Sequence, residues 1–164
     1  MCMSKLITGV SDLFKRIVCT LLLVLVSFGF SVNASAANRF QWIMSTDYVT
    51  ISYDTQSIKY LSTPSKIVDV WVSWNYTEEG ARKFLEHNRA QGRYKTEKWD
   101  DFSFYLEHLL ISKTASKFLG AIIYDVNGNV IEQSPYGENE EWGDFVPGSN
   151  GEAIRNKFSG FLDS

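Results

Sequence analysis

The chain has 164 residues, of which 45% are hydrophobic, 15% are aromatic and 21% are charged, and its 16 basic and 19 acidic residues give a net charge of −3. This length and hydrophobic content allow one domain with a core of its own. Nucleic acid is a poor partner for an acidic chain, because binding to phosphates needs clustered lysine and arginine. We therefore expect no nucleic-acid partner.

The first 36 residues follow the order of a secretory signal peptide. Three basic residues precede an apolar run from Ile17 to about Val32, and small residues follow in "NASAAN". This order predicts cleavage after Ala36, with Ala34 or Ala37 as alternatives. A retained membrane anchor is the rival interpretation, but the apolar run is shorter than the roughly 20 residues that span a bilayer. We expect export to the periplasm, the cell surface or the medium, with no membrane span after cleavage.

Both cysteines, Cys2 and Cys19, lie within this segment. A chain cut after Ala36 would therefore form no disulfide and would offer no thiol nucleophile or Cys-ligated zinc. Cys19 as a lipid-attachment residue is an alternative, but it stands at the start of the apolar run rather than at its end. The segment contains three of the basic residues and one of the acidic residues, so the remaining 128 residues carry a net charge of −5.

Alternation with a period of two predicts four strands before the first helix. Residues 40–44 and 48–53 read as short strands and "QSIKYLS" as a weaker third. The fourth strand, residues 67–76, is the clearest. One of its faces is wholly apolar and consists of Val68, Val70, Val72, Trp74 and Tyr76. The other face is mixed, as expected of an antiparallel strand with one side on the core.

The stretch "TEEGARKFLEHNRAQG" changes to the period of a helix. Thr77 is placed to cap this helix, Glu78 and Glu79 suit the positive end of its dipole, and Gly92 suits its end. We interpret the polar stretch that follows, "GRYKTEKWDD", as a solvated loop.

Strand signals return in "FSFYLEHLLIS". A helix is the competitor, since the stretch lacks helix breakers, but its aromatic residues and the hairpin that follows favour a strand. In that hairpin, "FLGAIIYDVNGNVIEQ", the pair Asn127-Gly128 is a strong turn signal. The acidic "SPYGENEEWGDF" reads as a loop.

The last section, "PGSNGEAIRNKFSGFL", predicts a capped amphipathic helix rather than a phosphate-binding loop. Gly151 is followed by Glu152, whose charge repels phosphate, where a phosphate loop needs lysine. Ser149 and Glu152 have the spacing of a capping box, in which Ser149 accepts from the Glu152 amide and Glu152 reaches back to the Ser149 N–H. The predicted fold is α+β: an antiparallel sheet of about six strands with a mid-chain helix and a C-terminal helix packed on the sheet, in a single domain over residues 37–164.

Residues suited to catalysis or metal binding are scarce. The only histidines, His87 and His108, each follow a glutamate, and neighbouring residues of a strand or helix do not face the same way. The sequence "PGSNG" around Ser149 is not the G-x-S-x-G of a nucleophilic serine. The acidic run 138–144 lacks the ligand spacing of an EF-hand. We therefore expect no catalytic residue, no metal and no cofactor.

The five tryptophans all follow residue 36, and three of them are the predicted binding residues. Trp74 belongs to the apolar face of its strand and should lie in the core. Trp71 is on the opposite, more polar face, and Trp99 and Trp142 lie in polar stretches. Tryptophan is favoured as an interface anchor, so Trp71, Trp99 and Trp142 are the candidates for binding. The alternative for Trp71 is that one of the helices covers it.

Four motifs, "YVTISYDTQSIKY", "VDVWVSWNYTEEG", "YDVNGNVI" and "WGDFVPGSNGEAI", follow one another over almost the whole chain after residue 36. Their order resembles that of the surface-adhesin protein E-like family of bacterial envelope proteins. The resemblance implies a six-stranded antiparallel sheet with a C-terminal helix against it, and a non-enzymatic surface protein that binds host matrix or plasma proteins such as vitronectin and laminin. It also raises the expectation of a homodimer. Family members commonly have a disulfide between helix and sheet and a lipid anchor, and this chain departs from both.

We therefore expect an exported, non-catalytic binding protein of the bacterial envelope or surface, of adhesin type, whose partner is a host extracellular-matrix or plasma protein. Two alternatives stay open. One is a soluble periplasmic or secreted enzyme that uses Glu138, Glu140 or Asp144, and the other is a carrier that holds a small ligand in an aromatic pocket.

Overall fold

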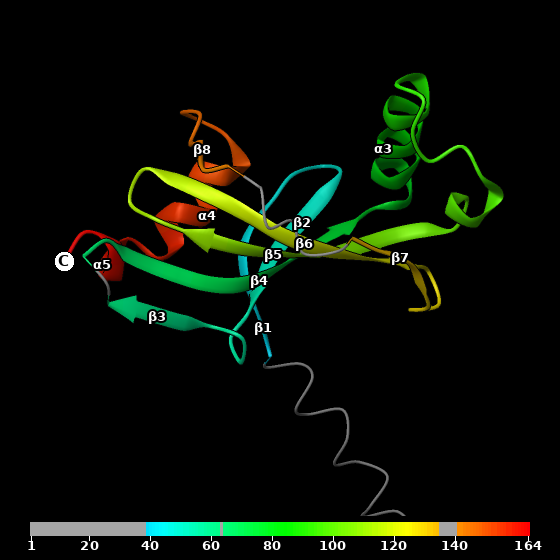
Figure 1. Cartoon of the computed structure of the whole chain (residues 1–164). Coiled ribbons are helices and arrows are strands. Elements are labelled where there is room, and N and C mark those ends of the chain that lie inside the picture. Colours follow the sequence, from blue (N-terminus) through cyan, green and yellow to red (C-terminus); the bar gives the residue numbers. More distant parts are fainter. Residues whose placement is uncertain (1–38, 63, 135–140) are drawn as a thin grey trace, which may run out of the picture. The chain divides into compact units, whose positions relative to one another are not determined.

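The computed structural model describes residues 39–62, 64–134 and 141–164 (Figure 1). Arg39–Ser164 form one compact unit. The predicted signal peptide, residues 1–36, lies outside the described residues, and so do Glu138 and Glu140 of the enzyme alternative.

Strands dominate the described residues. They are β1 (Phe40–Ser45), β2 (Val49–Asp54), β3 (Lys59–Ser62), β4 (Lys66–Tyr76), β5 (Phe102–Ile111), β6 (Ala115–Asp125), β7 (Val130–Gln133) and β8 (Gly143–Asp144). The helices are α3 (Glu78–Ala90), the short 3-10 helix η1 (Glu97–Trp99), α4 (Asn150–Lys157) and α5 (Ser159–Leu162).

One antiparallel sheet contains all eight of these strands, in the main order β1-β2-β4-β5-β6-β7. In addition, β3 pairs with β4 beyond the end of β2, and β8 pairs with β6. Residues 102–111, for which a helix was the competitor, form a strand, and β6 and β7 form the hairpin predicted around Asn127-Gly128. The predicted α+β class is therefore confirmed, with six ordered strands, a mid-chain helix and a C-terminal helical section.

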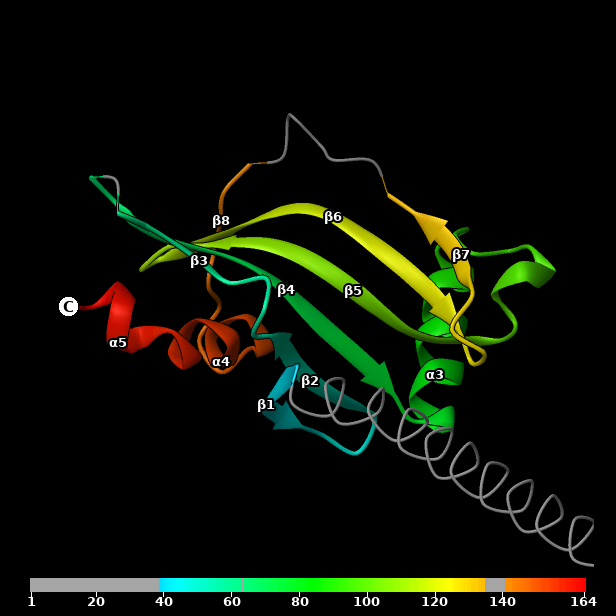
Figure 2. The ribbon, with the colours of Figure 1, turned by 90° about the horizontal axis from the view of Figure 1, so that it is seen from below.

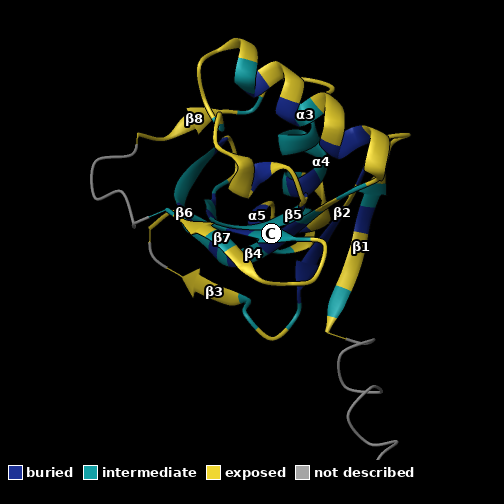
Figure 3. Ribbon diagram, turned by 90° about the vertical axis from the view of Figure 1, so that its right-hand side faces the viewer, coloured by how far each residue is buried: buried dark blue, intermediate teal, exposed yellow. Residues whose placement is uncertain are grey.

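The register of β4 on β5 decides which side chains share a face of the sheet. Val68 lies opposite Ile111, and both are fully buried. Trp71 lies opposite His108 and points to the other side, because successive side chains of a strand alternate between the faces. The helices α3, α4 and α5 lie on the side of Val68, which we call the helix face (Figure 3).

The first core lies between the helix face and the C-terminal helices. Its buried residues are Ile43, Val49, Ile51, Tyr53, Val68, Val70, Val72, Leu109, Ile111, Ile154, Phe158 and Leu162. The last three come from α4 and its extension, and they are only 2%, 5% and 4% exposed. Burial of such side chains contributes about 1.5 to 3 kcal/mol each, so the helices dock on the sheet through apolar contact.

The second core lies under α3 and consists of Ala81, Leu85, Trp99, Phe102 and Ile123. Here η1 carries Trp99 inward, and the Trp99 ring centroid is 3.8 Å from that of Tyr94. The interpretation of residues 92–101 as a solvated loop is therefore wrong for this part of the stretch. The charged neighbours of Trp99 face outward, and they dominated the composition of the segment.

The N-terminus of α3 is seated directly on the residue that precedes β2. The Thr77 hydroxyl accepts a hydrogen bond from the Gly80 N–H at 3.1 Å, which is the predicted cap, and the Thr77 N–H donates to the Tyr48 carbonyl at 3.0 Å. A Cβ atom at Gly80 would lie 2.1 Å from the same carbonyl oxygen. Glycine is therefore required here by close approach of two backbones.

Gly80→Ala should lower the free energy of unfolding by about 2 kcal/mol or more, although alanine is the better helix former, because the added methyl group must displace the Tyr48 backbone. Gly160→Ala is the matched control in α5, where a Cβ meets nothing within 4 Å. We expect this control to be neutral or to stabilise by about 0.5 kcal/mol. Urea unfolding of both variants measures the difference, and equal midpoints would contradict the close approach.

The hydrogen bonds at the N-terminus of α4 differ in one partner from the predicted capping box. The Ser149 hydroxyl accepts from the Glu152 N–H at 3.2 Å, as predicted. The Glu152 carboxylate reaches back to the N–H of Gly148, at 2.7 Å, and the Ser149 N–H donates instead to the Val146 carbonyl. Gly148 has a φ of +76°, so the chain turns there and presents its N–H to the carboxylate. The hydrogen bond to the Glu152 carboxylate therefore comes from Gly148, one residue before the predicted donor, Ser149.

Ser149→Ala should destabilise the protein by about 1 kcal/mol, because the Glu152 N–H loses its acceptor. Ser149→Asp keeps a capping oxygen and should restore most of that stability. The thermal midpoints of the two variants against the parent measure the effect. A Ser149→Ala variant that melts with the parent would show that the cap is not needed to hold α4.

Candidate functional site

The face of the sheet opposite the helices is the first candidate site. No helix of the described residues covers it, and Figure 3 shows α3, α4 and α5 on the other side. Figure 2 shows β4, β5 and β6 side by side. We define the open face by its half-buried side chains on these three strands: Ile67, Asp69, Trp71, Phe104, Leu106, His108, Leu110, Ile122 and Tyr124.

Asp69 and His108 form a cluster with Trp71 on the open face and hold its ring in place. The His108 Nε2 and Asp69 Oδ1 atoms are 2.6 Å apart, and these two side chains are only 12% and 15% exposed. The Trp71 ring stacks on the His108 ring with centroids 4.7 Å apart and an interplanar angle of 11°. Lys59 on β3 extends the cluster, with its Nζ 3.7 Å from the other Asp69 oxygen. The carboxylate thus orients the imidazole, and the imidazole in turn supports the indole.

A second stacked pair lies farther along the open face. The rings of Phe104 and Tyr124 come from neighbouring strands, and their centroids are 4.5 Å apart at an angle of 8°. Side chains on a sheet stand roughly perpendicular to it, so both stacked pairs turn their edges outward. Rings held in this way lose little conformational freedom when a partner covers them, which favours them as anchors.

The three predicted binding residues lie in different places. Trp71 is on the open face, so the alternative that a helix of the described part covers it is wrong. Trp99 is 3% exposed in the second core, and its prediction as a binding residue is corrected, because a sealed side chain cannot anchor a partner. Trp142 is 42% exposed next to β8 and belongs to neither core. The structure does not bring the three together.

Glu107 is a buried carboxylate that the sequence reasoning did not single out. It lies opposite Val72 and therefore on the helix face, while the next residue, His108, is on the open face. The Trp74 Nε1–H donates to its Oε2 at 2.8 Å. Burial raises the pKa of Glu107 to about 7, and the Trp74 hydrogen bond opposes that shift. Strict alternation along β5 could have placed this carboxylate on the core side.

The described part of the chain contains no group of three or more His, Cys, Asp or Glu side chains that could hold a metal ion. Of the acids in the enzyme alternative only Asp144 is described, and it lies exposed in β8. No helix among the described residues is long and apolar enough to span a membrane.

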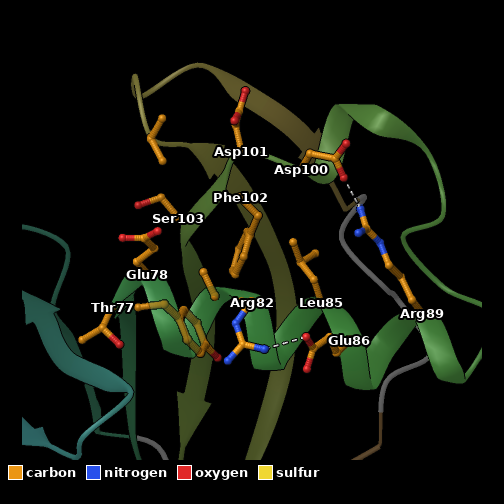
Figure 4. A pocket seen from close by; sticks show the side chains of 13 residues that line it. Thr77, Glu78, Arg82, Leu85, Glu86, Arg89, Asp100, Asp101, Phe102 and Ser103 are labelled. Atoms are coloured by element: carbon orange, nitrogen blue, oxygen red, sulfur yellow. Dashed lines mark hydrogen bonds and ion pairs between the residues drawn. The ribbon is translucent and has the colours of Figure 1, made fainter.

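A groove beside α3 is the second candidate site. Its volume is about 610 Å³, and it lies between α3 on one side and the start of β5 with the β6–β7 turn on the other (Figure 4). Leu85 and Phe102 of the second core belong to its lining. Charged side chains surround this apolar part. We call this feature the α3 groove.

Comparisons with protein-family models, with curated proteins and with solved structures find no match to this chain.

Glu107→Gln should stabilise the protein at pH 8 and have little effect near pH 4. The folded-state pKa of about 7 exceeds the ordinary value of 4.5, so the folded state holds the proton more tightly than the unfolded state. The contribution of Glu107 to the stability of the parent is therefore fully present at low pH and is lost as the pH rises through this interval. Glutamine stays neutral and can still accept from Trp74. We expect a gain of about 2 kcal/mol at pH 8, less than the full linkage value because the residue is not sealed from water.

Thermal unfolding of the parent and of Glu107→Gln from pH 4 to pH 8 measures this gain. Glu97→Gln is the control, since it removes an exposed carboxylate and should change stability by less than about 0.5 kcal/mol. A constant difference between Glu107→Gln and the parent over this pH range would contradict a proton held by Glu107 in the folded state.

Proposed function

We propose that the chain is an exported, non-catalytic binding module of the bacterial envelope that holds a protein partner through the open face. The observation that supports this most strongly is the row of half-buried aromatic and aliphatic side chains on β4, β5 and β6, which no described helix covers. In most two-layer folds each apolar face is buried against another element. A face left uncovered and lined with ordered aromatic rings suits an interface.

The size of the open face suggests how a partner would sit. Three neighbouring strands and residues 104–110 of β5 span roughly 14 by 20 Å, or about 300 Å². A stable interface buries about 800 Å² on each side. The partner must therefore extend onto neighbouring strands. Leu61 on β3 and Trp42 on β1 point to the same side as the open face, and they are 37% and 62% exposed.

The class of partner rests on the sequence. The signal-peptide order of residues 1–36 supports export, and the motif order that resembles the surface-adhesin protein E-like family supports a host extracellular-matrix or plasma protein as the partner. The acidic charge of the chain after residue 36 disfavours nucleic acid. A homodimer through the same face would compete with such a partner, so concentration dependence belongs in the test.

Leu61→Glu should weaken binding to surfaces coated with vitronectin or laminin by about fivefold or more, because it buries an unpaired charge at the edge of the contact. Leu61 is exposed, so the protein should still fold. Val146→Glu is the matched control, since it adds the same charge at a position that is 67% exposed in the loop before α4. Saturation binding over a range of protein concentrations is the measurement.

Equal binding by Leu61→Glu and the parent would contradict the role of the open face. Equal loss in both variants would assign the effect to net charge. Absence of saturable binding by the parent to either protein would contradict the proposed class of partner.

A further inference from the structure

The α3 groove carries a charge arrangement that the open face does not explain. Its lining includes four carboxylates, Glu78, Glu86, Asp100 and Asp101, and two guanidinium groups, Arg82 and Arg89. These side chains come from α3 and from the residues just before β5, so both walls of the groove are charged. The lining as a whole has an excess of two negative charges.

Both arginines are already engaged. Arg82 Nη1 lies 2.7 Å from Glu86 Oε1, and Arg89 forms an ion pair with Asp100 (Figure 4). Glu78 and Asp101, in contrast, have no ion pair among the described residues. An anionic ligand would have to break one of the existing pairs. A cationic ligand, in contrast, meets two carboxylates that have no ion pair in the described part of the chain, of which Glu78 interacts only with the positive end of the α3 dipole. Charge complementarity therefore favours a cation.

The apolar part of the groove favours an organic cation with an apolar stem over a metal ion. Ala81, Leu85 and Phe102 form the floor of the groove, but they are only 8%, 6% and 3% exposed, so the apolar surface open to a ligand comes mainly from Val126. Val126 lies on the wall opposite α3 and is 65% exposed. Lysine and arginine combine an apolar stem with a charged head, and they cover apolar surface while the head stays near water. A bare metal ion would gain nothing from this surface.

We propose that the α3 groove receives a lysine or arginine side chain of a protein partner, with the stem against Val126 and the charged head near Glu78 and Asp101. This site lies on the helix face of the sheet and is independent of the binding proposed for the open face. A partner with an exposed basic and apolar segment fits it.

The test uses the purified protein and three fluorescein-labelled hexapeptides, GLKLKG, GLQLQG and GLELEG, which share their leucines and differ in charge. Fluorescence polarisation should show saturable binding of GLKLKG, at least tenfold weaker binding of GLQLQG and none of GLELEG. Added salt should weaken the binding of GLKLKG, because exposed ion pairs are screened. Equal binding of all three peptides would overturn the proposal, and so would the absence of saturable binding of GLKLKG.

A matched pair of double variants separates the groove from general attraction to an acidic protein. Glu78→Gln with Asp101→Asn removes the two groove carboxylates and should weaken GLKLKG binding about fivefold. Glu79→Gln with Glu97→Gln removes the same charge from residues that do not line the groove, and it should leave the affinity within about twofold. Equal loss in both double variants would overturn the proposal.

Val126→Lys gives a third readout at an exposed position, where folding should not suffer. The added cation occupies the mouth of the groove and should abolish GLKLKG binding. Leu61→Glu, on β3 beside the open face, should leave peptide binding unchanged or slightly stronger. Loss of peptide binding in Leu61→Glu, with Val126→Lys unaffected, would place the peptide on the open face and overturn the assignment to the groove.

Discussion

The pairing of β4 with β5 is the interaction on which the rest of the structure depends. Its register directs Val68 and Ile111 to the helix face and Trp71 and His108 to the open face. A shift by one residue would exchange the two sets, because side chains alternate along a strand. Both cores rest on one side of this pair, and the candidate binding face is the other side. The fold and the proposed function therefore follow from the same register.

Two features of the helix face are not explained by apolar contact: a buried carboxylate and a close contact between two backbone segments. Glu107 sits among its apolar neighbours with one hydrogen bond from Trp74, at a cost that rises with pH. Gly80 lets the start of α3 contact the backbone of Tyr48, where a larger residue would not fit. The cysteines lie at positions 2 and 19, so no disulfide can form within residues 39–164. The C-terminal helices dock instead through Ile154, Phe158 and Leu162, and Ser149 caps the start of α4.

Much of the fold was accessible from the sequence because its signals are local. Alternation predicts β4 and β5, the pair Asn127-Gly128 predicts a hairpin, and Thr77 and Ser149 mark helix starts. Contacts between residues far apart in the chain could not be predicted from the sequence. The charged residues around Trp99 suggest a solvated loop, yet packing on Tyr94 outweighs that composition. The contact of His108 with Asp69 joins residues 39 positions apart, and only the strand register brings them together.

Hydroxyl-radical footprinting of the tryptophans tests the central claim, that the open face is accessible and binds a partner, most directly. In the free protein the account predicts oxidation of Trp71 at a rate between those of exposed Trp142 and buried Trp99. With the host matrix protein bound, Trp71 should become protected while Trp142 stays reactive. If Trp71 is as protected as Trp99 in the free protein, or if its rate does not change when the partner is bound, the open face is not the binding surface.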